Sequence, residues 1–212
     1  MSQVFEEEKH EELRARVRRF AQERVQPRVA QMERTRALDV ELSAQIAAQG
    51  WIGVTIPLSY GGMGLGHLAK TIIIEELARV SGAMGAMVQA SQLGVAKILH
   101  FGTPEQKARW LPPIASGQCL PTIAVTEPGS GGHVLGMSSH AVRDGDEYVL
   151  NGLKVFVGNS HIGDVHGIVM RTGAGSRGLT AFLGGGRPPG RAVGAARGDA
   201  RPVRLQLRDR GA

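Results

Sequence analysis

The chain has 212 residues, of which 42% are hydrophobic, and a formal net charge of +6. This length fits one large domain or two small ones, and the hydrophobic content supports a folded core rather than a disordered chain. A single cysteine, Cys119, excludes an internal disulfide framework and a cysteine-based zinc site.

The positive charge is concentrated toward the end of the sequence. From Gly184 onward there are seven arginines and two acidic residues, so the preceding residues carry a net charge of only about +1. No aromatic residue lies among these arginines, and stacking aromatics are typical of surfaces that bind single-stranded nucleic acid. We therefore expect no nucleic-acid partner.

The first ten residues are too acidic and polar for a signal or transit peptide. No apolar run approaches the length of a membrane span. The single cysteine also fits a reducing compartment. We expect a cytoplasmic protein without a membrane span.

The first half of the chain has the periodicity of amphipathic helices. Pro27 should kink or split the first helix, and Asp39 is a candidate N-cap for the second. The last helix should start after the N-cap Thr103 and end before Pro112-Pro113. The predicted helices are Glu7 to Glu33, Asp39 to Gln49, His67 to Val80, Ala83 to Phe101, and the short one after Thr103.

The pattern changes to short apolar runs after Gln118. Asp144-Gly145 and Asn151-Gly152 are hairpin-turn signals. The predicted strands are Pro121 to Val125, Met137 to Arg143, Asp146 to Leu150, Leu153 to Val157, His166 to Arg171, and Leu179 to Leu183.

These patterns predict an α+β fold. An N-terminal all-α helical bundle, residues 1–118, precedes a mostly antiparallel β domain, residues 119–183. Residues 184–212 form an atypical tail rich in Arg, Gly and Pro. This composition is typical of a shifted reading frame in a GC-rich gene or of an arbitrary chain end, and both explanations stay open.

The most informative stretch runs from Ile123 to Gly136 and reads I-A-V-T-E-P-G-S-G-G-H-V-L-G. An apolar strand leads into a glycine-dense turn with hydroxyls at Thr126 and Ser130. Glycines let backbone N–H groups approach a ligand closely and converge on an anion. A second polar loop follows, N-G-L-K-V-F-V-G-N, from Asn151 to Asn159.

Together the two loops resemble the flavin-binding signature of acyl-CoA dehydrogenases, T-E-P-x-x-G-S-D followed by N-G-x-K-x-W-I-T-N. The stretch Trp51 to Gly66 is similar to that family's G-x-x-x-P-x-x-Y-G-G-x-G loop. The resemblance covers about Leu13 to Leu183. It implies a partial acyl-CoA dehydrogenase fold whose C-terminal helical domain is missing.

The resemblance implies FAD as cofactor and an acyl-CoA or acyl-carrier-protein thioester as substrate, in fatty acid or polyketide metabolism. In the family, a carboxylate removes the α-proton of the thioester while the β-hydrogen leaves as hydride to the flavin. An electron-acceptor flavoprotein or oxygen would reoxidise the flavin, and the protein would be a homo-oligomer.

The site residues are carried over by motif position. The Gly129 to Gly132 loop would lie near the pyrophosphate and the thioester tail, and Phe156 to Gly158 replace the family's W-I-T. The implied substrate-binding residues are Gly85, Ala86, Met87 and Gly132. The implied cofactor-binding residues are Ile123, Ala124, Val125, Thr126, Gly129, Ser130, Gly131, Gly132, Phe156, Val157 and Gly158.

Three substitutions depart from the family pattern. Gly132-His133 replaces Ser-Asp, Phe156 replaces Trp, and Gly158 replaces a hydroxyl residue. The family's catalytic glutamate would lie in the missing domain, so no catalytic residue is assigned. Glu75 and Glu76 are interpreted as surface acids of the third helix, and Glu127 as a structural residue of the turn. The histidines show no metal-binding spacing, so no metal is expected.

Three functions stay open. The first is an FAD-dependent acyl-thioester dehydrogenase, present in truncated form. The second is a non-catalytic remnant or binding module of the same fold. The third is a related flavin oxidase or monooxygenase, which oxygen consumption would distinguish from a dehydrogenase. Without the last domain, we also expect exposed apolar surface and self-association.

Overall fold

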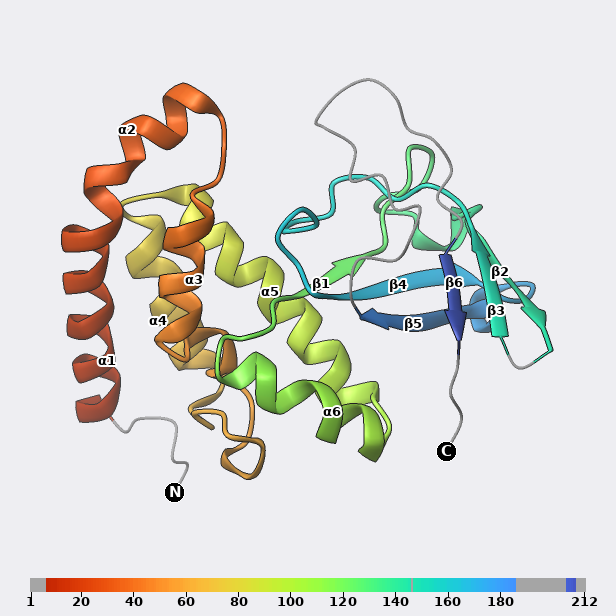
Figure 1. The fold of residues 1–212 in the computed structure, drawn as a ribbon, viewed down its shortest axis with the longest axis horizontal. Helices are drawn as coiled ribbons and strands as arrows, with labels where there is room; N and C mark the ends of the chain where they lie inside the picture. Colours follow the sequence, from red (N-terminus) through yellow and green to blue (C-terminus); the bar gives the residue numbers. More distant parts are fainter. Residues whose placement is uncertain (1–6, 146, 186–204, 209–212) are drawn as a thin grey trace. The chain divides into compact units, whose positions relative to one another are not determined.

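The structure, a computed structural model, describes residues 7–145, 147–185 and 205–208 (Figure 1). The chain divides into two compact units, Met1–Leu120 and Pro121–Ala212. The described part of the first unit is helical, and that of the second forms a sheet. The predicted fold class, a helical bundle followed by a mostly antiparallel β domain, is confirmed. Most of the predicted tail, 184–212, lies outside the described residues.

The first predicted helix is one helical stretch with three parts. α1 spans Glu7–Phe20, a π-helical segment spans Ala21–Val25, and α2 spans Gln26–Thr35. Pro27 lies in the first turn of α2, where it has no N–H to donate to the preceding turn. The wider π turn accommodates this gap in the hydrogen-bond ladder. The disruption that Pro27 predicts is therefore local and does not end the helix.

Four further α-helices complete the described part of the first unit. They are α3 (Val40–Ala48), α4 (Gly66–Ala78), α5 (Gly82–Phe101) and α6 (Pro104–Ala115). Side-chain caps begin three of them: Asp39 accepts from Leu42 N, Ser81 from Met84 N, and Thr103 from Gln106 N. Short 3-10 turns, Trp51–Gly53 and Leu58–Tyr60, lie between α3 and α4.

The prediction that the helix after Thr103 ends before Pro112-Pro113 is wrong. α6 continues through both prolines to Ala115. Each proline removes one backbone donor and crowds the carbonyl four residues earlier, which costs stability inside a helix. Leu111, Ile114 and Ala115 are buried there. The apolar face of this turn outweighs the local preference of proline against helix.

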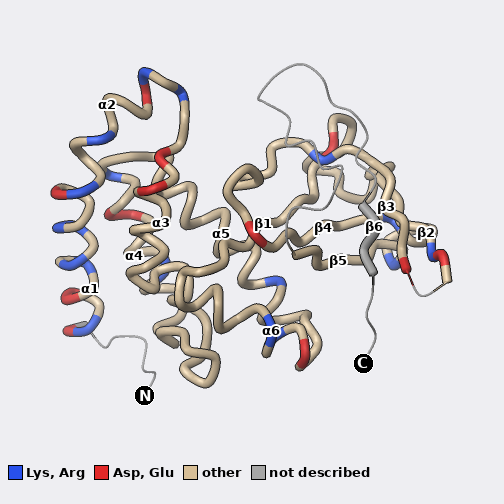
Figure 2. The backbone as a smooth tube through the Cα atoms, viewed as in Figure 1, with Lys and Arg blue, Asp and Glu red and all other residues tan. Residues whose placement is uncertain are grey.

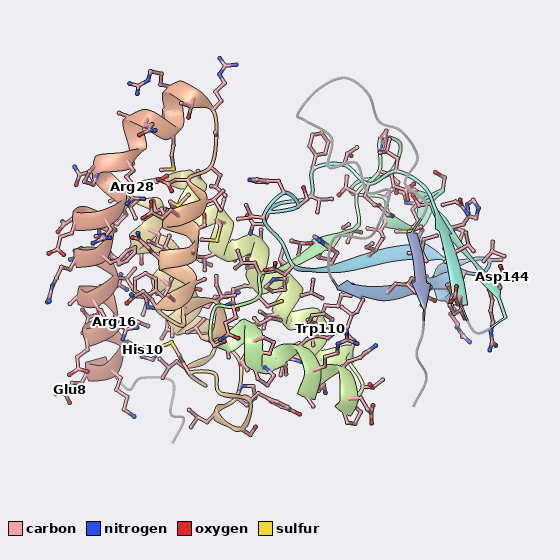
Figure 3. The ribbon with its side chains drawn as sticks, viewed as in Figure 1. Glu8, His10, Arg16, Arg28, Trp110 and Asp144 are labelled. Carbon is pink, nitrogen blue, oxygen red and sulfur yellow. The ribbon has the colours of Figure 1, made fainter. Side chains whose placement is uncertain are left out.

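Aromatic and polar contacts join the first helical stretch to the elements that follow it. Trp51 is fully buried, and its ring meets that of Phe20 edge to face with centroids 5.1 Å apart. Arg16, which Figure 3 labels on α1, has its guanidinium 5.7 Å from the centroid of the Trp51 ring. Arg28 on α2 donates to Asp39 Oδ2 at 3.1 Å. These contacts fix α1 and α2 against the start of α3 and the turn after it.

α4 and α5 approach each other closely at Gly85. A Cβ at this position would lie 2.7 Å from Ala78 Cβ and 3.0 Å from the carbonyl oxygen of Ile74. No side chain larger than hydrogen fits without a shift of one helix. Met87, two residues after Gly85, is buried, whereas Ala86 between them is exposed.

A buried carboxylate joins α1 to α4. Figure 2 shows acidic and basic residues interspersed along α1. Arg18 donates to Glu76 through Nε at 2.9 Å and Nη2 at 2.8 Å, and Arg14 Nη1 donates to it at 3.0 Å. The Glu76 side chain is only 1% exposed. The prediction that Glu76 is a surface acid is therefore wrong, whereas its neighbour Glu75 is half exposed.

The second unit contains a mixed sheet in which antiparallel pairing dominates. The strand order is β1-β4-β2-β3-β6, and β5 pairs with β4. β2 with β3, β3 with β6 and β4 with β5 are antiparallel, whereas β1 and β4 are parallel, with Thr122 opposite His166. The strands are β1 (Pro121–Ala124), β2 (His140–Asp144), β3 (Glu147–Asn151), β4 (Val165–Arg171), β5 (Leu179–Gly185) and β6 (Leu205–Arg208).

The core of this unit is a cluster of five buried residues from β1, β2, β3 and β4. Tyr148 and Phe182 pack against it with ring centroids 5.1 Å apart. Their contact joins β3 to β5 across the sheet. The buried core residues are Ala124, Ala141, Leu150, Ile168 and Met170.

The strand predicted at Leu153 to Val157 does not form. The Leu153 N–H donates to Ser139 Oγ at 3.2 Å, and the Val155 N–H donates to the Thr126 carbonyl at 2.8 Å. These donors are therefore used by loop residues and not by a neighbouring strand. A Cβ at Gly152 would collide with Ser139, so glycine is required at this junction.

We predict that Glu76→Gln lowers the free energy of unfolding at pH 7 by about 1.5–3 kcal/mol, because it removes charged hydrogen bonds in a buried position. The hydrogen bonds from Arg18 are the main cause of the lowered pKa of Glu76. The stabilisation is therefore present above the ordinary pKa of 4.5 and is lost as the pH falls below it. Urea unfolding between pH 7 and pH 3 measures both effects. The matched control is Glu75→Gln, for which we expect less than about 0.5 kcal/mol, and equal effects of the two substitutions would contradict this assignment.

We predict that Gly85→Ala destabilises the first unit by about 1–3 kcal/mol, because the added methyl group forces α4 and α5 apart. Helix propensity alone would give the opposite sign, a gain of about 1 kcal/mol. Gly82→Ala on the same helix is the control, since a Cβ there meets no described atom within 4 Å. Thermal unfolding followed by circular dichroism distinguishes the two. Stabilisation by both substitutions would show that Gly85 is not a close contact.

Candidate functional site

The structure brings the two motif segments of the second unit together. The first segment, 123–132, consists of the last two residues of β1 and the turn that follows it, and the second, 156–158, lies in the loop after β3. The Val155 N–H donates to the Thr126 carbonyl at 2.8 Å, and Lys154 Nζ donates to the Val125 carbonyl at 3.0 Å. Residues that are far apart in the sequence thus form one surface.

Glu127 is the centre of this junction. Its carboxylate accepts from Lys154 Nζ at 2.7 Å, from Ser138 N at 2.7 Å and Ser138 Oγ at 3.0 Å, and from Ser139 N at 3.0 Å. The residue is only 4% exposed. Burial opposes its ionisation, but the hydrogen bonds from Lys154, Ser139 and Ser138 lower the pKa of Glu127 to about 2. The structural role predicted for Glu127 is confirmed.

The glycine-rich turn begins at Glu127 and closes on Ser130. The Glu127 N–H donates to the Ser130 carbonyl at 2.8 Å, and the Ser130 N–H donates to the Glu127 carbonyl at 3.1 Å. The Ser130 hydroxyl donates to the His133 carbonyl at 2.6 Å. Ser130 is thus a buried brace of the turn, and its hydroxyl proton is already used within the protein.

The residues after this turn present unpaired donors. Within the described part of the chain, the backbone N–H groups of Gly131, Gly132, His133 and Val134 find no acceptor. Gly131 and Gly132 are exposed, and neither has a positive φ. A Cβ at Gly129 or Gly132 would meet no described atom within 4 Å. Protein packing does not require glycine at these two positions, and the open space beside the free N–H groups suits an anionic ligand.

The segment between β1 and the turn contributes one hydroxyl. Thr126 is half-buried, and its side chain forms no hydrogen bond with a described residue. Ile123 and Val125 are also half-buried, whereas Ala124 belongs to the buried core of the sheet. Of these four residues, Thr126 therefore has a polar group available to a ligand.

Phe156 is held in an unusual position on the second segment. Its backbone has a φ of +56°, and the residue is 95% exposed. A left-handed conformation costs a non-glycine residue about 1–2 kcal/mol, and an exposed ring gains nothing from burial. Val157 packs against the sheet core, and Gly158 is exposed. The strain is typical of a functional position rather than of a packing residue.

The implied substrate residues are split between the two units. Gly85, Ala86 and Met87 lie on α5, where Gly85 serves helix packing and Met87 is part of the core. Gly132 lies in the glycine-rich turn of the second unit. An acyl-binding role for these four residues remains a prediction.

The sequence interpretation missed two important residues. Lys154 occupies the lysine position of the N-G-x-K motif, so the motif itself could have indicated it. Arg171, at the end of β4, donates to backbone carbonyls of the loop 133–139. No sequence motif distinguishes it from the other arginines.

Other classes of site find no support among the described residues. No group of three or more His, Cys, Asp or Glu side chains is placed to hold a metal ion in residues 7–145, 147–185 and 205–208. None of the helices that the structure describes is both long and apolar enough to cross a membrane. The second unit instead presents backbone N–H groups without an acceptor among the described residues and an exposed aromatic side chain, Phe156.

Sequence comparison agrees with this division of the chain. The sequence model of the acyl-CoA dehydrogenase N-terminal domain matches residues 7–118, and that of the acyl-CoA dehydrogenase middle domain matches residues 122–200. The mitochondrial isovaleryl-CoA dehydrogenase of Pongo abelii is 34% identical over 183 residues, which cover 83% of this chain and 43% of that protein.

Two solved structures share the fold. Butyryl-CoA dehydrogenase from Megasphaera elsdenii has a TM-score of 0.81 and 27% identity, over 90% of this chain and 51% of its own. Glutaryl-CoA dehydrogenase from Mycobacterium smegmatis in complex with FADH2 has a TM-score of 0.82 and 25% identity, over 99% of this chain and 53% of its own. The chain therefore spans about half the length of these relatives. With both domain models matched in order, the chain belongs to the acyl-CoA dehydrogenase family.

Proposed function

We propose that the second unit binds FAD and that the chain is part of an FAD-dependent dehydrogenase of acyl thioesters. The observation that carries this proposal is the junction at Glu127. It joins the two motif segments while the N–H groups that follow the turn stay unpaired. The glutaryl-CoA dehydrogenase that shares the fold is itself a complex with FADH2, which supports the same cofactor here.

The available groups fit the chemistry of FAD. The N–H groups of Gly131, Gly132 and His133 would bind the pyrophosphate, which needs donors wherever it leaves water. The Thr126 hydroxyl and the backbone at Val157 and Gly158 would serve the polar edge of the ring system. Phe156 would cover one face of a flat ring. Ser130 holds the turn from within, so it does not replace the hydroxyl lost at Gly132.

When bound, FAD supplies the two-electron oxidation of the acyl chain. The proposed substrate class is an acyl-CoA, with an acyl-carrier-protein thioester as the alternative carrier. The proposed acceptor of the electrons is a flavoprotein or oxygen. What the described residues contribute is binding and orientation of the cofactor.

Neither buried carboxylate of the described residues suits a catalytic base. Glu76 is held ionised by Arg14 and Arg18, and the pKa of Glu127 is about 2. A base with so low a pKa accepts a proton poorly near neutral pH. This observation favours a second candidate function, a flavin-binding module in which these 212 residues bind the cofactor but do not dehydrogenate acyl-CoA by themselves.

We predict that the chain retains FAD and that Phe156→Gly weakens FAD binding by about tenfold or more, since stacking on an aromatic ring is worth about 1–3 kcal/mol. The same substitution relieves the left-handed strain at this position. We therefore expect the unfolding temperature of the apoprotein to be unchanged or higher. Visible absorption after removal of free cofactor and quenching of FAD fluorescence measure binding, and calorimetry measures unfolding.

Phe101→Gly is the matched control, because Phe101 is also a highly exposed aromatic residue but lies on α5 of the first unit. It should leave FAD binding unchanged. Absence of any retained flavin would overturn the proposed cofactor site for this chain. Equal FAD affinity of the Phe156→Gly variant and the unchanged protein would remove Phe156 from the site. Bleaching of bound flavin by an acyl-CoA would favour the dehydrogenase over the binding module.

A further inference from the structure

All three nitrogens of the Arg171 guanidinium donate hydrogen bonds to backbone carbonyls. Nε donates to the Met137 carbonyl at 3.2 Å, and Nη2 donates to the Leu135 carbonyl at 2.5 Å. Nη1 donates to the carbonyls of Gly173 and Gly175, each at 3.1 Å. Within the part of the chain that the structure describes, no carboxylate pairs with this guanidinium. Arg171 thus links the end of β4 to the loop 133–139, which follows the glycine-rich turn.

Arg171 and Glu127 hold the same peptide group from its two ends. The carbonyl and the N–H of a trans peptide point in opposite directions. The peptide between Met137 and Ser138 directs its carbonyl to Arg171 Nε and its N–H to Glu127 Oε2 at 2.7 Å. A cation therefore lies at the negative end of this peptide dipole and an anion at its positive end, so the orientation of the peptide is fixed.

The next residue is held in the same way through backbone groups. The Ser139 N–H donates to Glu127, and its carbonyl accepts from the backbone N–H of Arg171 at 2.9 Å. On the other side, the Leu135 carbonyl faces Arg171 while the Gly136 N–H donates to the His133 carbonyl at 3.0 Å. This contact closes the 3-10 turn Val134–Gly136.

Apolar packing contributes little to this loop. Every residue from Gly131 to Gly136 is exposed, so hydrogen bonds must determine its conformation. The unpaired N–H groups of the proposed cofactor site lie in this exposed stretch. Their direction depends on the peptides that Arg171 and Glu127 orient.

We propose that Arg171 is the positioning residue of the cofactor loop: it holds the loop 133–139 in the conformation that presents the free N–H groups, and it acts through four hydrogen bonds to backbone carbonyls of the protein. This inference rests on the proposed FAD site for its functional consequence. Its structural part, the control of the loop by Arg171, is independent of the cofactor.

The first test is amide hydrogen exchange of the apoprotein, followed by NMR at Gly136, Met137, Ser138 and Ser139, whose N–H groups are all hydrogen-bonded. In Arg171→Gln we expect exchange at these amides to quicken by about tenfold or more. Exchange in the paired strands β4 and β5 should change by less. In Arg171→Lys, which retains one charged donor, the effect should be intermediate, and this variant decides the question if Arg171→Gln does not fold.

Arg143→Gln is the matched control, because Arg143 is an exposed arginine whose one side-chain hydrogen bond among the described residues goes to the Gly145 carbonyl in its own hairpin turn. It should leave exchange at residues 136–139 unchanged. The proposal is overturned if these amides exchange in folded Arg171→Gln or Arg171→Lys as they do in the unchanged protein. It is also overturned if β4 and β5 are loosened to the same extent, since Arg171 would then act only on the stability of the unit.

The second test is FAD binding by fluorescence quenching. Arg171→Gln should raise the Kd by about tenfold or more, Arg171→Lys by less, and Arg143→Gln should leave it unchanged. If the unchanged protein binds FAD and Arg171→Gln binds it equally well, the positioning role is wrong. If the unchanged protein binds no FAD, the proposed function fails, and the exchange experiment still decides the role of Arg171.

Discussion

The buried ion pair of Glu127 and Lys154 joins two segments that are 27 residues apart in the sequence. The Glu127 carboxylate also accepts from the backbone N–H groups of Ser138 and Ser139, and the Lys154 ammonium also donates to the carbonyl of Val125. Each charge therefore satisfies backbone groups as well as its partner, Glu127 those of residues 138–139 and Lys154 that of Val125. A buried pair of this kind is stable only when its remaining donors and acceptors are also hydrogen-bonded. For the Glu127 carboxylate, the N–H groups of Ser138 and Ser139 and the hydroxyl of Ser138 provide these bonds.

Both units use a buried carboxylate in the same way. Glu76 joins α1 to α4 through Arg14 and Arg18, and Glu127 joins the two motif segments through Lys154. In each case the acid is almost fully buried, and its pKa is lowered. These carboxylates organise the fold and are not available for proton transfer. The groups that we propose for ligand binding in the second unit are instead uncharged: backbone N–H groups, a threonine hydroxyl and an aromatic ring.

Much of this architecture could be predicted from the sequence, because helix caps such as Asp39 and Thr103 and the turn at Asp144-Gly145 act locally. The errors arose where tertiary contacts outweighed local preference. Buried residues of α6 override Pro112-Pro113, and hydrogen bonds to Ser139 and Thr126 replace the strand expected at Leu153 to Val157. Glu76 could not be distinguished from Glu75 by pattern alone, since burial depends on a helix 58 residues away. The left-handed backbone of Phe156 likewise has no local sequence signal.

Hydrogen exchange at the Val155 amide tests the central claim most directly, because this N–H donates to the Thr126 carbonyl across the junction of the two segments. It should be measured in Glu127→Gln, in Lys154→Met and in the double variant. If the ion pair holds the segments together, each single substitution quickens exchange by about tenfold or more, and the double variant exchanges no faster than the faster single one. Unchanged exchange, or two effects that simply add, would show that the segments meet without this ion pair.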